Sequence, residues 1–272
     1  MDVARAKSIV ILLLIAFNVF LLANNLIHRD SQSVSKEVLE NTETILEQRG
    51  VKLECDIPST PGGASRLVYI TGGLDRDSIA ENLLGEEYEI SADGYIFSHD
   101  GKRIVFEDQN RFTYTDDELL TSKGSISEKE AGEAALRFMK EKGLLGGKYV
   151  PDDAIKNSDG SWTFDYIETF SGSFLYDNSF SITISQNYVS RLIYHKQQIK
   201  GFSSESIERA QAYQALLSRF KDETDIIITS IDSGYKLDES AMEEMESVEL
   251  LPVWRVKLKG ISEPVYIGSH DS

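Results

Sequence analysis

Hydrophobic residues fill one continuous block near the start of the chain and alternate with polar residues after it. Residues 8–27, SIVILLLIAFNVFLLANNLI, carry no charge. A helix rises about 1.5 Å per residue, so about 20 residues match a hydrocarbon core ~30 Å thick. A cleavable signal peptide has a shorter apolar core and a small-x-small cleavage site, which this block lacks. The block therefore predicts a retained transmembrane helix.

The flanking charges predict how this helix is oriented. Arg5 and Lys7 precede the block, so the positive-inside rule keeps the N-terminus in the cytoplasm. No later segment approaches 18 apolar residues, the shortest length typical of a membrane span. We expect a single-pass protein of the cell membrane, with residues 1–30 as cytoplasmic stub and anchor and the rest of the chain extracytoplasmic.

Two of the three asparagines in the apolar block recur at helical spacing. Asn18 and Asn25 are seven residues apart and fall on nearly the same helix face. A buried amide favours a hydrogen-bonding partner, so this face is a candidate contact for another membrane helix. The alternative is that lipid adjusts around Asn18 and that Asn25 lies at the interface. The predicted partner face comprises Ile11, Leu14, Asn18, Leu21, Leu22 and Asn25.

Residues 31–122 predict a first small α+β domain. An amphipathic juxtamembrane helix spans residues 33–49 and stops at Gly50. After two predicted strands, residues 75–85 form a short helix. Four short strands then follow at residues 86–91, 94–99, 102–108 and 111–116. Their connections are too short to join parallel strands, so an antiparallel meander is expected.

Residues 123–272 predict a second domain of two similar halves. Ser127 and Glu130 form a capping box at the start of a helix over residues 126–143. A second helix is expected at residues 203–221, and three strands follow each helix. The repeated Ala and Leu positions indicate an internal duplication, although two unrelated amphipathic helices on sheets would also produce them. The expected fold class is α+β, with helices packed on antiparallel sheets in two extracytoplasmic domains.

Composition narrows the classes of partner. The net charge of −17 disfavours nucleic acid and anionic headgroups, and it fits either simple solubility or a cationic partner. The one cysteine, Cys55, excludes an intramolecular disulfide and a cysteine-based zinc site.

Candidate chemistry is sparse. None of the four histidines pairs with another at metal-ligand spacing, and no hydrolase, phosphate-loop or dinucleotide motif is present. Aromatic residues alternate from Trp162 to Tyr176, which is more typical of a sheet core than of a sugar-binding platform. We therefore predict no catalytic residue, no cofactor and no metal.

The start of the chain resembles a known family. Met1-Asp2 and the phrase Phe17-Asn18-Val19-Phe20-Leu21-Leu22 are similar to the opening of the YycH/YycI family, and most similar to YycI. Asn18 stands where that family has an acidic residue, so a role that needs a charge there is not implied. The resemblance implies a non-enzymatic membrane protein of Gram-positive bacteria. It also implies association with a YycH-like protein and with the sensor histidine kinase WalK (YycG), which controls cell-wall metabolism.

Two other readings of the extracytoplasmic part are possible. Helices followed by antiparallel strands also resemble PepSY or β-lactamase-inhibitor-protein-like modules, in which case the anchor is a passive tether. A cell-envelope hydrolase would need converging acids, Ser or His, and the sequence displays no such set.

Overall fold

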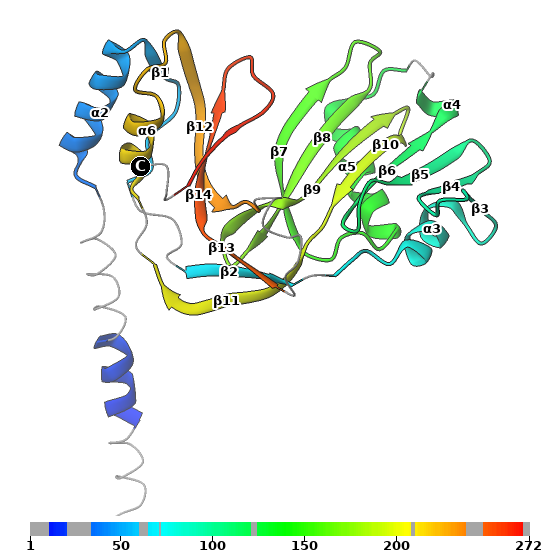
Figure 1. Cartoon of the computed structure of the whole chain (residues 1–272), viewed down its shortest axis with the longest axis horizontal. Helices are drawn as coiled ribbons and strands as arrows, with labels where there is room; N and C mark the ends of the chain where they lie inside the picture. Colours follow the sequence, from blue (N-terminus) through cyan, green and yellow to red (C-terminus); the bar gives the residue numbers. More distant parts are fainter. Residues whose placement is uncertain are drawn as a thin grey trace, which may run out of the picture. The chain divides into compact units, whose positions relative to one another are not determined.

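A computed structural model of the chain describes residues 11–20, 34–59, 65–70, 72–120, 124–207, 210–237 and 247–268. Residue contacts divide the chain into two compact units (Figure 1). Unit 1 comprises Met1–Pro61, Arg209–Asp232 and Trp254–Ser272, and unit 2 comprises Gly62–Glu208 and Ser233–Val253. These bounds differ from the predicted domain boundary at residue 122.

Unit 2 is built on a long antiparallel arrangement of strands. Along the sheet the order is β7-β8-β9-β10-β6-β5-β4-β3. The strands are β3 (Glu89–Ile90), β4 (Ile96–His99), β5 (Lys102–Phe106), β6 (Arg111–Asp116), β7 (Lys148–Lys156), β8 (Trp162–Phe170), β9 (Ser173–Ser185) and β10 (Tyr188–His195). The structure confirms the predicted meander from β3 to β6. Its turn at Asp100 and Gly101 has positive φ angles of 48° and 75°, as a tight hairpin requires.

Helices cover one face of this sheet. They are α3 (Arg76–Leu84) and α5 (Glu128–Glu141), and the short α4 (Asp117–Leu120) follows β6. The predicted capping box is confirmed, because the Ser127 side chain accepts the Glu130 N–H and the Glu130 side chain accepts the Ser127 N–H. Ala131, Ala134, Ala135 and Met139 line the buried side of α5. These residues share one core with α3 and with β4 to β10, so residues on both sides of position 122 pack together.

A second core in unit 2 lies against a three-stranded sheet. Its strand order is β11 (Gln198–Ser206), β2 (Ser65–Ile70) and β13 (Ser247–Leu250). The end of β12 (Ile226–Tyr235) adds Tyr235, whose hydroxyl donates to the Ser65 carbonyl at 2.7 Å. Gly234 pairs with Phe174, and a Cβ at this glycine would overlap the Phe174 carbonyl oxygen. A glycine is therefore needed where β12 meets β9.

Unit 1 is assembled from segments that are distant in the sequence. It contains α2 (Lys36–Gln48), β1 (Val51–Leu53), α6 (Ala212–Arg219), most of β12 and β14 (Pro252–Leu258), and β15 (Val265–Ile267). β1 pairs with β12, β12 is the neighbour of β14, and β14 pairs with β15. Leu46 of α2, Leu216 of α6 and Val256 of β14 meet in one buried core.

Three expectations need correction. Two pairings, β1 with β12 and β12 with β9, are parallel, so the sheets are mixed rather than antiparallel throughout. The predicted helix over residues 203–221 is limited to Ala212–Arg219, because β11 continues to Ser206 in pairing with β2. The stretch after α5 also contains β7, a strand that was not predicted, so this helix is followed by more than three strands.

Candidate functional site

The predicted membrane contact is partly within the described chain. Residues 11–20 are helical, and Ile11 and Leu14 expose 57% and 56% of their surface. Leu21, Leu22 and Asn25 of the predicted face lie outside the described residues. Within the described ranges, no helix has both the length and the apolar character needed to cross a membrane.

Asn18 satisfies part of its polarity within its own helix. Its Nδ2 atom donates to the Leu14 carbonyl oxygen at 2.8 Å, one helical turn earlier. The sequence suggested two ways to accommodate this amide, a partner helix or adjustment of the surrounding lipid. The bond within the helix is a third way. Because the amide has two N–H groups and an oxygen, the bond leaves hydrogen-bonding capacity on this face.

A pocket in unit 2 forms at the edge of the hydrophobic core, where the buried apolar residues of the sheet end. Three successive cross-strand pairs of β5 and β6 face the same side, because every second residue of a strand points to one face. The pairs are Phe106 with Phe112, Ile104 with Tyr114, and Lys102 with Asp116. The first two are apolar and buried, whereas the third is charged and lines the pocket.

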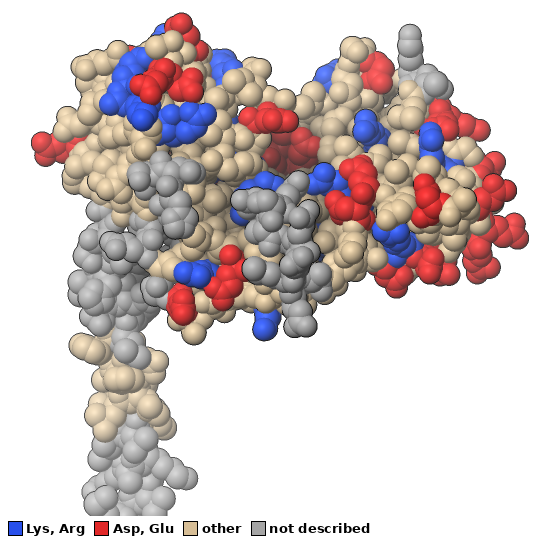
Figure 2. All heavy atoms as spheres, in the orientation of Figure 1, with Lys and Arg blue, Asp and Glu red and all other residues tan. Residues whose placement is uncertain are grey.

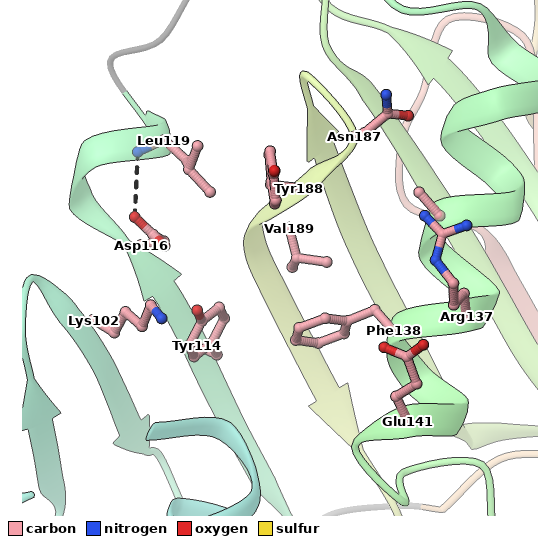
Figure 3. A pocket seen from close by; sticks show the side chains of 11 residues that line it. Lys102, Tyr114, Asp116, Leu119, Arg137, Phe138, Glu141, Asn187, Tyr188 and Val189 are labelled. Atoms are coloured by element: carbon pink, nitrogen blue, oxygen red, sulfur yellow. Dashed lines mark hydrogen bonds between the residues drawn. The ribbon is translucent and has the colours of Figure 1, made fainter. Parts of the chain in front are cut away.

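The rest of the pocket comes from α5 and from the hairpin between β9 and β10. Its volume is about 260 Å³. Figure 3 shows Lys102 and Tyr114 on one side, Arg137, Phe138 and Glu141 on the helix at the other side, and Tyr188 and Val189 on the strand between them. The full lining set is Lys102, Tyr114, Asp116, Leu119, Ala134, Arg137, Phe138, Glu141, Asn187, Tyr188 and Val189.

A tight turn and a bulge position the hairpin residues. Gln186 and Asn187 have φ angles of 50° and 73° and form the two-residue connection from β9 to β10. A register shift between Val189 and Arg191 inserts one extra residue into β10. Consecutive strand residues face opposite sides, so Val189 is buried while Tyr188 exposes 65% of its surface at the rim of the pocket.

Among the charged residues that line the pocket, Asp116 has a hydrogen-bond partner, whereas Lys102 and Arg137 have no ion pair within the described residues. Asp116 is 9% exposed, and its Oδ1 accepts the Leu119 N–H at 3.3 Å, which holds the start of α4. In the part of the chain that the structure describes, Lys102 and Arg137 have no ion-pair partner. Burial, and then the Asp116 charge, raise the pKa of the Tyr114 hydroxyl, which therefore stays protonated.

Two buried carboxylates of unit 2, Glu168 and Asp177, form ion pairs and hydrogen bonds that stabilise the fold. Glu168 is buried and bonded to Lys196 and to the Asn178 side chain. Asp177, which is 1% exposed, accepts the Lys236 Nζ at 2.6 Å and the Leu237 N–H at 2.5 Å. These contacts fix the segments that follow β10 and β12, so we assign them a structural role.

His195 of unit 2 and the possible metal ligands among the described residues were both predicted to have no catalytic or metal-binding role. Burial, followed by the Arg111 charge, lowers the pKa of His195 to about 4, so this imidazole is neutral at neutral pH. The described ranges hold no group of three His, Cys, Asp or Glu side chains that could bind a metal ion.

The surface charge of unit 2 is concentrated. Figure 2 shows acidic side chains gathered over α3 and β3. The exposed acidic residues of this acidic patch are Asp75, Asp77, Glu81, Glu86, Glu87 and Glu89. An acidic surface of this kind fits simple solubility as well as a cationic partner.

Sequence reasoning missed the pocket, although one signal for it exists. Lys102 and Asp116 occupy the core-facing register of β5 and β6, where an apolar residue is expected. A charge at such a position indicates that the helical cover ends there. Nothing comparable marks Arg137 or Tyr188, because exposed residues of these types are ordinary on protein surfaces.

Comparison with known proteins gives one family match. Residues 29–267 match the family profile described as "YycI protein". A solved structure, the Bacillus megaterium YpeB C-terminal domain, aligns with 88% of this chain and 94% of that chain at 12% identity and a TM-score of 0.37. No curated protein matches the chain.

Proposed function

The chain belongs to the YycI protein family, and from this we propose that it tunes a WalK-like sensor histidine kinase through its N-terminal apolar helix and its extracytoplasmic part. YycI proteins are non-enzymatic, membrane-anchored regulatory proteins associated with the WalK kinase. The family match over residues 29–267 is the observation that carries the association with the kinase, and the role given to the helix rests on the uncharged block of residues 8–27. We further propose that a YycH-like protein is part of the same assembly.

We propose that the helix supplies a bias between two kinase states. A kinase with two signalling conformations responds to a partner only through that partner's different affinities for them. A difference of ~1–3 kcal/mol shifts the equilibrium about 5–150-fold, which is enough for regulation. An interhelical amide bond contributes only ~0.6–2 kcal/mol, so it orients an assembly that packing holds together.

The internal bond of Asn18 lets the amide lie in the membrane with or without a partner helix. Because Nδ2 already donates to Leu14, the amide is partly satisfied before a partner arrives. This lowers the cost of keeping an amide in hydrocarbon. The amide that remains available lies beside the exposed side chains of Ile11 and Leu14.

The proposal is tested by Asn18→Leu in the full chain, expressed together with the kinase. We expect weaker co-purification and altered expression of kinase target genes, with unchanged folding of the extracytoplasmic part. The matched control is the double variant Asn18→Leu/Phe20→Asn, which keeps one amide but moves it to the opposite helix face. We expect it to behave like Asn18→Leu. Association and output equal to the parent chain in both variants would exclude a contact through Asn18 of the predicted partner face.

Exchange of residues 8–27 for an unrelated membrane helix tests the passive-tether alternative. Loss of regulation at unchanged membrane level supports a specific helix contact. Full regulation by the exchanged protein would favour a binding or inhibitor module that uses the anchor only for location.

A further inference from the structure

We propose that α2 pairs in parallel with α2 of a second copy of this chain in the same membrane. The contact face, which we call the α2 seam, comprises Val38, Asn41, Ile45 and Gln48. This inference goes beyond the proposed function, because it concerns pairing of the regulator with itself. It uses residues of unit 1 alone and does not depend on Asn18.

Only one side of α2 packs on unit 1. Thr42 and Leu46 are its buried residues, and the helix contacts β1 and α6 (Figure 1). Val38 and Ile45 lie on a different side and expose 36% and 38% of their surface, although both are apolar. Single exposed apolar residues are ordinary on proteins, so the spacing of these two decides whether they form a face.

The exposed residues have the spacing of a coiled-coil seam. Val38, Asn41, Ile45 and Gln48 follow one another by three, four and three residues, and all four are exposed. This alternation places them along one stripe of the helix, as the a and d positions of a coiled coil require. The seam therefore has the geometry to pack against another helix.

The charges of α2 lie outside the seam. Its acidic residues are Glu37, Glu40, Glu43 and Glu47, and none of them takes an a or d position. Only Glu37 flanks the seam, and in a parallel pair the residue opposite it is the uncharged Thr42 of the second copy. Two copies of a chain with a net charge of −17 can therefore meet at α2 without opposing like charges.

The seam residues favour an identical helix in parallel orientation. Val38 and Ile45 take the a positions, where β-branched side chains favour two parallel strands. Asn41 takes a d position, and its amide both donates and accepts, so it is complementary to the same side chain of another copy. A polar residue at such a position selects the register of the two helices.

The membrane supplies the orientation and the concentration that this short seam needs. Residues 28–35 connect the apolar block to α2, and eight residues reach at most ~30 Å, so α2 begins near the membrane surface. Two copies with the same anchor emerge on the same side, with their α2 helices parallel. Tethering raises the effective concentration of the second helix, and α2 is already folded on unit 1, so pairing orders little additional chain.

The test is a cysteine scan of the full chain in membranes of a host that lacks the kinase and the YycH-like protein. Cys55→Ala first removes the native thiol. The seam variants are Val38→Cys, Asn41→Cys and Ile45→Cys, and the controls at exposed positions off the seam are Glu40→Cys and Glu47→Cys. Mild oxidation should link two copies through the seam positions at least about fivefold more than through the controls, because a disulfide forms only between close Cα atoms.

Charge substitutions test the seam a second way. Val38→Glu/Ile45→Glu in the Asn41→Cys chain should lower the linkage at least about fivefold, because like charges would then face each other. The matched control Ile155→Glu/Ile261→Glu adds the same charge at exposed apolar positions away from α2 and should stay within about twofold of the parent. Circular dichroism and thermal unfolding establish that each variant is folded.

The outcomes decide the inference separately from the proposed function. Equal linkage at all five positions, or no linkage at positions 38 and 45, would overturn the inference even if the chain associates with the kinase. Capture of a different protein instead of a second copy in the native membrane would also overturn it. Linkage confined to the seam would support the inference, and it would do so even if the chain showed no association with the kinase, which would refute only the proposed function.

Discussion

Units 1 and 2 reach a packed core by different routes. In unit 2 most strands pair with a strand that is near in sequence, as in the meander from β3 to β6 and the hairpin of β9 and β10. In unit 1, β1 pairs with β12 in parallel, joining Val51 to Ile226. Local pairing costs little chain entropy, whereas distant pairing depends on a core that forms only when all segments meet. We therefore expect the two units to respond separately to substitutions.

The largest effect is expected at the buried carboxylate of unit 2. Asp177→Asn removes the charge that Lys236 faces and weakens the bond to the Leu237 N–H. Breaking a buried pair of this kind costs about 3–5 kcal/mol of unfolding free energy. The matching change in unit 1 is Asp232→Asn, which removes the partner of the buried Arg255. Chemical denaturation should show each variant shifting a different transition, and one common shift would mean that the units unfold together.

Core truncation should follow next in size. Leu46→Ala in unit 1 and Leu192→Ala in unit 2 each remove a fully buried side chain. The expected loss is about 2–5 kcal/mol for each. Unit 1 has the smaller set of buried hydrophobic residues, so the same loss is a larger share of its stability. Equal midpoint shifts in both units would contradict this distinction.

A smaller and pH-dependent effect is expected from His195 in unit 2. Its pKa is lowered to about 4 by burial and by the Arg111 and Lys236 charges, which outweigh the opposing Asp108 charge. The unfolded chain binds this proton first, near the ordinary pKa of ~6.5, so stability is complete above that pH and falls as the pH drops toward 4. The loss is on the order of 2 kcal/mol.

The measurement is the unfolding free energy of unit 2 at pH 7 and pH 4.5. His195→Gln should flatten its pH dependence, and His99→Gln, at an exposed hairpin position, serves as the control. A parent chain with no loss of stability between these pH values would refute the expectation.

The smallest effect is expected at the capping box of α5, which was predicted from the sequence and is present in the structure. Ser127→Ala removes the side chain that accepts the Glu130 N–H and should lower the stability of unit 2 by about 1 kcal/mol. Ser125→Ala, at an exposed position before the cap, should change it little. Equal effects of the two substitutions would show that the capping box does not stabilise α5.

The same contrast explains which parts of the fold were predictable. The capping box of Ser127, the turn at Asp100 and the helix end at Gly85 are set by neighbouring residues, and the structure contains all three. The parallel pairing of β1 with β12 leaves no local trace. The residues before α6 have helix-favouring side chains, but pairing of β11 with β2 determines their conformation as far as Ser206.

The candidate sites divide in the same way. The apolar block and its asparagines are visible in the sequence, because a run of twenty uncharged, mostly apolar residues has the length of a membrane span. The pocket depends on where α5 ends over the sheet and on the bulge near Val189, and neither is readable from residue types. Only the charges of Lys102 and Asp116 at core-facing positions indicate it.

The assembly of unit 1 from distant segments has a consequence for biogenesis. Glu54 pairs with Lys259 across 205 positions of sequence, and the buried faces of α2 and β1 are covered by α6 and β14. During synthesis these faces emerge long before the residues that cover them. A chain whose synthesis stalls between the two would expose leucines and valines that are otherwise buried, which makes it a ready substrate for proteases that remove unfolded chains.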